Sequence, residues 1–151
     1  MNLVERFAEA FNRRDVDGLL SLFTEDATYR DLFYGPHSGQ PALRRMFERM
    51  FREGRDYRWY MEAIVMDARR AAAEWTFGYT ATAAVPRSEG RSVRFSGMSI
   101  FDLEGGDLEG GDQGGRIRAY REYADTGTAL LQLGFAPESL AKVLARRLPT
   151  A

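Results

Sequence analysis

The chain has 151 residues, of which 44% are hydrophobic and 28% charged, and its formal net charge is −1. This length fits one globular domain, and the near-neutral charge gives no overall field that would attract nucleic acid or anionic lipid. The absence of cysteine and the presence of one histidine, His37, exclude disulfides, cysteine nucleophiles and thiolate or His-rich metal sites. No apolar run approaches the length of a membrane span and no signal-peptide core follows Met1, so we expect a cytoplasmic protein without a membrane partner.

The first part of the chain predicts two helices. Apolar side chains recur at helical spacing from Asn2 to about Arg14, which indicates an amphipathic helix. Asp15 is placed to cap a short second helix, whose apolar side holds Leu19, Leu20 and Phe23.

A short strand, a loop and a third helix follow. The pattern predicts the strand over Asp26–Asp31 and the Gly/Pro-containing loop over Leu32–Gly39. The third helix follows Ser38, carries Pro41 in its first turn, where a missing N–H costs nothing, and ends at Gly54.

From residue 57 the pattern changes to long strands rich in aromatic and β-branched residues. Because these strands follow one another without crossover elements, we expect an antiparallel meander. After Asp125 come a short helical turn and a C-terminal helix over residues 137–148. The predicted strands are Tyr57–Asp67, Ala71–Val85, Arg91–Leu103 and Arg116–Ala124.

A small sequence repeat lies between the last two predicted strands. DLEGG at Asp102–Gly106 recurs at Asp107–Gly111 and DQGG follows, but the spacing of acidic residues matches no known calcium loop. We therefore predict a flexible hairpin loop over residues 104–115.

Helices followed by a run of strands indicate an α+β fold, and residues 1–151 read as a single domain. A long aromatic sheet cannot leave both faces wet, and a twisted sheet can curl around helices on its concave side. We therefore expect a cone with an internal pocket. Its convex face offers an aromatic surface for a partner, most simply a second copy of the chain.

The last predicted strand, RIRAYREYAD, carries a candidate catalytic group. Strand alternation puts Ile117 on the face of Arg121 and Tyr123, and Glu122 on the face of Tyr120. If the face of Glu122 lines a cavity, this carboxyl group can be tuned for acid–base chemistry. The alternative is a solvated residue on the wet face of the sheet.

Three segments resemble the nuclear transport factor 2-like superfamily, and within it the SnoaL-like polyketide cyclase and limonene epoxide hydrolase branch. They are ATYRDLFYGPHSGQPALRRMF, SGMSIFDL and RIRAYREYADTGTALLQLG. The resemblance covers nearly the whole chain. It implies a cone-shaped α+β barrel (a cystatin-like roll), a deep apolar pocket and homodimers packed sheet to sheet.

The resemblance also allows the hydrolase site to be compared position by position. The Tyr and Asn of the first strand are Tyr29 and Asp31 here, and the Asp of the last strand is Glu122. The Arg and Asp of the middle strand are replaced by Trp75 and Phe77. Epoxide hydrolysis is therefore disfavoured.

The remaining candidates suit proton transfer next to a carbonyl group. Two carboxyl groups in an apolar chamber push each other's pKa apart, so that Glu122 can act as general base with Asp31 or Tyr29 as its partner. The resemblance to SnoaL-like cyclases implies that such a cyclisation or isomerisation needs no cofactor and no metal. The alternative is that Asp31 pairs with Arg30 or Arg121, and that Glu122 is paired likewise.

Further side chains define the predicted pocket. His37 is either a second proton carrier or a loop residue bonded to backbone. The ligand we expect is a flat, hydrophobic, ring-containing molecule. Other possibilities are a non-catalytic ligand-binding module and a protein-interaction domain. The predicted binding residues besides His37 are Trp59, Trp75, Phe77, Tyr79, Phe95 and Tyr120.

Overall fold

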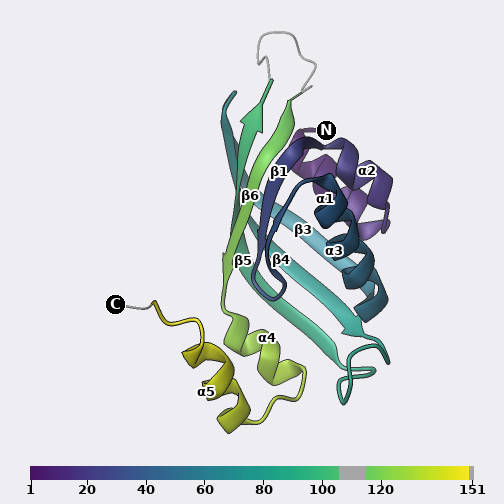
Figure 1. Cartoon of the computed structure of the whole chain (residues 1–151), viewed down its shortest axis with the longest axis vertical. Coiled ribbons are helices and arrows are strands. Elements are labelled where there is room, and N and C mark those ends of the chain that lie inside the picture. Colours follow the sequence, from purple (N-terminus) through teal and green to yellow (C-terminus); the bar gives the residue numbers. More distant parts are fainter. Residues whose placement is uncertain (106–114, 150–151) are drawn as a thin grey trace.

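A six-stranded sheet forms the frame of the molecule in the computed structural model, which describes residues 1–105 and 115–149 (Figure 1). The order across the sheet is β2-β1-β6-β5-β4-β3. All neighbouring strands are antiparallel except β1 and β6, which are parallel. The strands are β1 (Phe23–Asp31), β2 (Gly35–Ser38), β3 (Gly54–Met66), β4 (Arg70–Ala81), β5 (Ser92–Glu104) and β6 (Arg116–Ala124).

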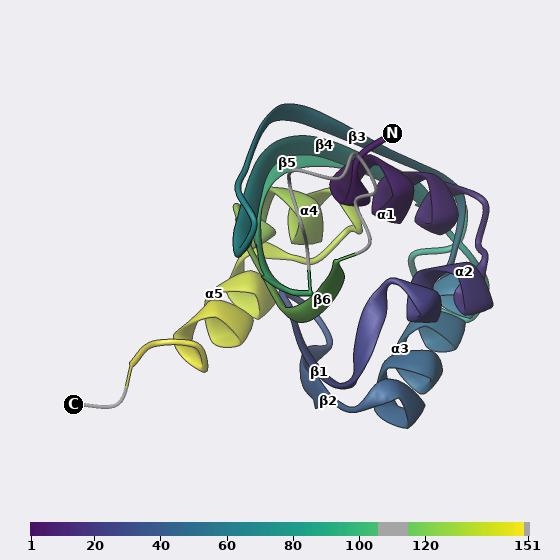
Figure 2. The ribbon, with the colours of Figure 1, turned by 90° about the horizontal axis from the view of Figure 1, so that it is seen from above.

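The sheet curves around the N-terminal helices, as Figure 2 shows. Its edge strands β2 and β3 do not pair, so the sheet stays open, and the helices fill the gap. The predicted α+β cone is therefore confirmed, although it is not a closed barrel. The helices are α1 (Leu3–Asn12), α2 (Val16–Ser21), α3 (Gln40–Glu53), α4 (Thr126–Gln132) and α5 (Pro137–Ala145).

Local capping explains where the first helices begin. Asn2 and Glu5 form a capping box at α1, in which each side chain accepts the other residue's backbone N–H. The side chain of Asp15 caps α2 by accepting the N–H of Gly18 at 2.8 Å, as predicted. Helix α3 has no side-chain cap: it begins after Gly39, whose positive φ of 82° suits glycine, and not directly after Ser38.

The core is built largely of aromatic rings. Phe7, on the inner face of α1, is fully buried and contacts rings from four strands: Phe23, Trp59, Phe101 and Tyr120. Helix α1 therefore sits inside the curved sheet, and the space beyond its C-terminal end is where a cavity can form.

Several predicted boundaries are corrected by the structure. The loop expected over Leu32–Gly39 contains β2, which pairs with β1 and closes a hairpin. Strand β4 stops at Ala81, because the chain turns at residues 82–85 with Val85 N–H bonded to Thr82 O. The C-terminal helix ends at residue 145 rather than 148.

Strand β6 contains a bulge that breaks its alternation. Asp102 pairs with Ala119, but Leu103 pairs with Ile117, so β6 has one extra residue at this point. Ile117 is consequently fully buried, and the expectation that it shares a face with Arg121 and Tyr123 is wrong. The bulge leaves Tyr120 and Glu122 together on the inner face.

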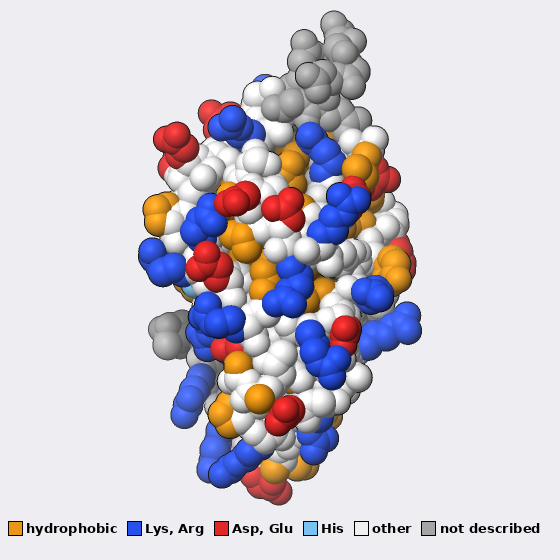
Figure 3. Space-filling model, turned by 90° about the vertical axis from the view of Figure 1, so that its right-hand side faces the viewer, with side chains coloured by type: hydrophobic (Ala, Val, Ile, Leu, Met, Phe, Trp, Pro, Cys, Tyr) orange, Lys and Arg blue, Asp and Glu red, His pale blue; other side chains and the backbone are white. Residues whose placement is uncertain are grey.

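The predicted flexible loop over residues 104–115 lies almost entirely outside the described residues. Across the face shown in Figure 3, basic and acidic side chains are interspersed. The surface ion pairs of the protein include that of Arg44 with Asp17 at 2.6 Å. None of the helices in residues 1–105 and 115–149 is long and apolar enough to cross a membrane.

Candidate active site

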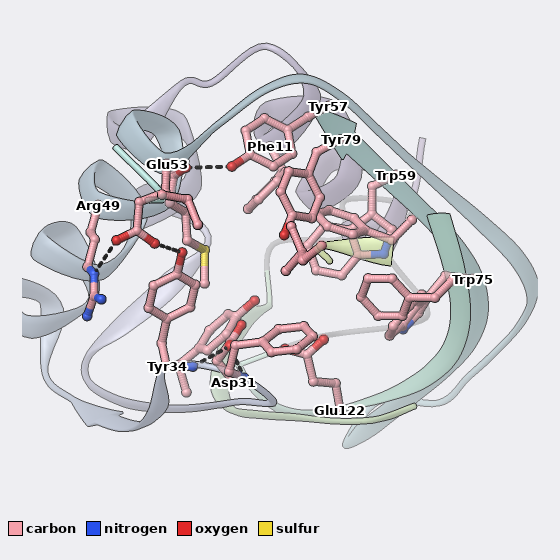
Figure 4. Close-up of a pocket in the computed structure, with 17 residues that line it drawn as sticks. Phe11, Asp31, Tyr34, Arg49, Glu53, Tyr57, Trp59, Trp75, Tyr79 and Glu122 are labelled. Atoms are coloured by element: carbon pink, nitrogen blue, oxygen red, sulfur yellow. Dashed lines mark hydrogen bonds and ion pairs between the residues drawn. The ribbon is translucent and has the colours of Figure 1, made fainter. Parts of the chain in front are cut away.

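A cavity of about 220 Å³ lies between the curved sheet, the end of α3 and the β1–β2 turn (Figure 4). Its wall is mainly aromatic, and carboxyl groups reach it from two sides. The predicted residues that line it are Tyr29, Asp31, Trp59, Trp75, Phe77, Tyr79, Phe95 and Glu122. The other two predicted residues, Tyr120 and His37, do not line it.

Asp31 ends β1 and is held by the turn that follows. Its Oδ1 accepts the backbone N–H groups of Phe33 at 2.7 Å and Tyr34 at 2.8 Å. Burial raises the pKa of Asp31, and these two donors oppose the rise because they stabilise the carboxylate. The Asp31 carboxyl group is thus fixed in direction and prepared to carry a charge.

Glu122, on β6, is 7% exposed and lines the same cavity. Burial and the neighbouring charge of Asp31 raise its pKa well above 4.5. Hydrogen bonds from the backbone of Leu32 and from Tyr120 oppose this rise, while its buried Oε1 has no hydrogen-bond partner within the described part of the chain. The expectation of a solvated residue on a wet face therefore does not hold.

The two carboxyl groups are neighbours because β1 and β6 run parallel in register, with Tyr29 opposite Tyr120 and Arg30 opposite Arg121. A side-chain hydrogen bond between them lowers the pKa of Asp31 and raises that of Glu122. Asp31 therefore loses its proton first, while Glu122 keeps its own. This order favours Asp31 as base and Glu122 as acid, the reverse of the assignment that the sequence suggested.

Two buried tyrosines support this pair. The rings of Tyr29 and Tyr120 stack with centroids 4.2 Å apart. Burial raises the pKa of both hydroxyl groups well above 10, so both stay protonated. Tyr120 lies behind the cavity wall, where its hydroxyl group is 2.7 Å from Oγ of Ser99.

The arginines considered as partners for the carboxyl groups point elsewhere. Arg30 donates to the hydroxyl of Tyr123 at 2.7 Å, and Arg121 pairs with Asp102 at 2.6 Å. Both of these arginines are therefore engaged on other groups, and the ion-pair alternative for Asp31 through either of them is not what the structure shows.

His37 lies on β2 opposite Tyr29, outside the cavity lining. Its Nδ1 is 3.2 Å from the carbonyl oxygen of Gly35, which is the backbone contact that one of the two sequence interpretations described. Its charged form would lower the pKa of Asp31 from this position, so its influence on the site is indirect.

The sequence did not identify a second polar group at the cavity. The hydroxyl of Tyr34 donates to Glu53, and Arg49 Nε donates to the same carboxylate at 2.8 Å. The guanidinium of Arg49 also lies over the ring of Tyr34, 4.9 Å from its centroid. In the sequence, the sign of this group was the i,i+4 spacing of Arg49 and Glu53 on the third predicted helix, which indicates an ion pair. Figure 4 shows this group across the cavity from Trp75.

The sequence did not identify Ser99 as part of the site either. Ser99 is fully buried on β5, in the row of inward-facing residues that includes Phe95 and Phe101. A serine in such an apolar row is a detectable signal, because a buried hydroxyl group needs partners. Within the described residues no cluster of three or more His, Cys, Asp and Glu side chains could hold a metal ion.

The fold is an open α+β cone, and carboxyl groups lie inside its aromatic cavity. The chain belongs to the SnoaL-like domain family, whose profile matches residues 4–109. No curated protein matches the chain at a significant level.

Solved structures share the fold of this chain. A candidate polyketide cyclase from Xanthomonas campestris pv. campestris is 25% identical, with a TM-score of 0.66 over 87% of this chain and 93% of that one. An LEH-like epoxide hydrolase from M. tuberculosis is 19% identical, with a TM-score of 0.66 over 95% and 93%. A hypothetical protein with a ketosteroid isomerase-like fold from Catenulispora acidiphila is 16% identical, with a TM-score of 0.73 over 90% and 95%.

Proposed function

We propose that this protein catalyses cofactor-free proton transfer next to the carbonyl group of a small, hydrophobic, ring-containing ketone, leading to cyclisation or isomerisation. The observation that carries the proposal is the pair of adjacent carboxyl groups at an aromatic cavity, of which Glu122 is buried and Asp31 half-buried. The similarity to a structure described as a candidate polyketide cyclase supports the same class of substrate.

In the proposed reaction, Asp31 takes the proton from the carbon next to the carbonyl group. Glu122 donates to the carbonyl oxygen, where negative charge develops as the enolate forms. Return of a proton to a different carbon completes an isomerisation, whereas attack of the enol carbon on a second carbonyl completes an aldol cyclisation. The residues lose and regain protons only, so no oxidant or reductant is consumed.

The aromatic wall supports a flat apolar ligand more than a charged one. Trp59, Trp75 and Phe77 form a continuous set of edge-to-face contacts along the cavity, with centroids 5.0–6.5 Å apart. Epoxide hydrolysis is not proposed, because Trp75 and Phe77 occupy the positions at which the resemblance places the hydrolase Arg and Asp.

The test is exchange of the acidic C–H protons of 2-tetralone, a bicyclic ketone, in D2O, followed by NMR. We expect Asp31→Asn to slow enzyme-dependent exchange by roughly 10²–10⁴-fold, and Glu122→Gln to slow it by a smaller factor. Glu62→Gln is the matched control, because Glu62 is exposed on β3. Binding without exchange above the buffer rate would instead indicate a ligand-binding module, and neither binding nor exchange across a panel of cyclic ketones would favour an interaction domain.

A further inference from the structure

A line of buried hydrogen bonds runs from Trp75, which lines the cavity, through Ser99 to Tyr120 in the layer behind the cavity wall. Nε1 of Trp75 donates to Oγ of Ser99 at 2.7 Å, and Oγ of Ser99 is 2.7 Å from the hydroxyl of Tyr120. All three residues are at most 2% exposed. Water therefore does not compete for these groups, and each proton must find its acceptor within the line.

The chemistry of the donors fixes the direction of this line. An indole N–H can only donate, so Trp75 occupies one lone pair of Ser99 Oγ. Ser99 has a single hydroxyl proton, and Tyr120 is its one remaining side-chain partner among the described residues. The arrangement that leaves no buried donor unsatisfied runs from Trp75 to Ser99 and from Ser99 to Tyr120.

The proton of Tyr120 is then free to point away from Ser99. Tyr120 and Glu122 lie on the same inner face of β6, and Ser99 pairs with Glu122 in the β5–β6 register. Ser99 and Tyr29, as side-chain hydrogen-bond partners, lower the pKa of Tyr120, which is the effect of groups that donate to its oxygen. Tyr120 in turn lowers the pKa of Glu122, which places the Tyr120 proton on the side of that carboxyl group. Asp31 and Tyr29 are the other ionisable groups that face Glu122.

We propose that Ser99, oriented by Trp75, is a positioning residue that directs the hydroxyl proton of Tyr120 toward Glu122. The inference rests on the proposed acid–base role of Glu122, because it assigns what controls the readiness of that group to give up its proton. A donor that itself accepts a hydrogen bond is strengthened by it, so removing Ser99 weakens the contact of Tyr120 with Glu122.

The test is the titration of Glu122, followed by NMR of protein carrying ¹³C-labelled glutamate carboxyl groups. Tyr120→Phe should raise the pKa of Glu122, since the donor to the carboxylate is lost. Ser99→Ala should raise it in the same direction by a smaller amount, and Ser99→Thr should restore the wild-type value. Ser96→Ala, three residues earlier on the exposed outer face of β5, is the control and should leave the titration unchanged.

If the hydrogen bond between Ser99 and Tyr120 ran in the opposite direction, the pKa of Glu122 would shift in the opposite direction. If Tyr120 donated to Ser99, Ser99→Ala would release the tyrosine proton for Glu122 and lower the pKa of Glu122, which would overturn the proposal. A measurement on the wild-type protein needs no variant to fold: the Trp75 indole N–H resonance should shift with the midpoint of the Glu122 titration. An indole resonance that is constant through that titration also contradicts the proposal.

These readouts do not depend on turnover. Failure of ketone exchange with the expected titration shifts would reject the proposed function and leave the hydrogen-bond direction intact. Ketone exchange without the expected titration shifts would reject the positioning role of Ser99 and leave the proposed function intact.

Discussion

The backbone N–H of Tyr34 donates to Oδ1 of Asp31 at 2.8 Å, while the hydroxyl group of the same tyrosine donates to Glu53. Tyr34 thus joins the turn that holds the proposed base to the end of α3. Because both contacts lie at the cavity, the position of Asp31 depends on a residue whose side chain points away from it.

Tyr34→Phe should therefore destabilise the protein and disturb the site. Loss of a hydrogen bond to a partly buried carboxylate should lower the free energy of unfolding by about 1.5 kcal/mol, as measured by urea denaturation. Tyr60→Phe is the matched control, because Tyr60 is 57% exposed on the sheet's outer face. Equal unfolding midpoints for the two variants would show that the contact of Tyr34 with Glu53 contributes nothing to stability.

Glu122 should make the stability of the protein depend on pH in a definite direction. Its pKa in the folded state is raised above the usual 4.5 by burial and by Asp31, so above about pH 4.5 the folded state binds more protons than the unfolded state. The contribution of Glu122 is thus fully present below that pH and is lost progressively as the pH rises through the folded-state value.

Glu122→Gln removes this dependence, because the amide cannot ionise. The urea midpoint of the variant, relative to the wild type, should increase as the pH rises from 4.5 toward neutrality. Because Glu122 and Asp31 shift each other's pKa, the comparison reports the titration of the pair, of which Glu122 is the member that keeps its proton to higher pH. A difference that stays flat or shrinks over this range would mean that Glu122 is not protonated in the folded protein.

Gly97 should tolerate no side chain. It pairs with Trp75 across β4 and β5, and a Cβ atom at this position would lie 2.5 Å from Cη2 of Trp75 and 2.6 Å from the backbone oxygen of Tyr123. Gly97→Ala should cost about 1–3 kcal/mol of stability, because the indole must move within a packed wall. It should also change tryptophan fluorescence. Ser96→Ala, one residue away on the outer face, should do neither.

The sequence sufficed for the helices and for the four long strands because each depends on local periodicity. It also placed Asp31 and Glu122 among the candidates, since the resemblance points to the ends of two strands that face inward. What it could not show is that Tyr29 lies opposite Tyr120 in a parallel pair. Periodicity assigns a side chain to a face of its own strand, but pairing between strands about 90 residues apart depends on the whole fold.

The roles of the two carboxyl groups needed the structure for a different reason. Their order of ionisation depends on the N–H groups of Phe33 and Tyr34, which come from a turn where the sequence indicated only a loop. The burial of Ile117 was likewise hidden, because a bulge shifts the alternation without leaving a mark in composition. In both cases backbone geometry, rather than residue type, decided the outcome.

Asn12, the last residue of α1, gives a further prediction because it fixes the helix to the sheet. Its Nδ2 donates to the carbonyl oxygen of Trp59 at 3.0 Å, and its Oδ1 accepts the N–H of Trp59 at 2.7 Å. The side-chain amide thus satisfies both backbone groups of a residue whose ring lines the cavity.

Asn12→Ala leaves both of those backbone groups without their partner, so it should cost about 2 kcal/mol in urea denaturation. Asn12→Asp keeps the acceptor and loses the donor, and should fall between the alanine variant and the wild type. Glu9→Ala on the same helix breaks only an exposed pair with Arg13 and should cost at most about 0.5 kcal/mol. If Asn12→Ala were no more destabilising than Glu9→Ala, water would be replacing the amide, and the cavity wall at Trp59 would not depend on α1 for its position.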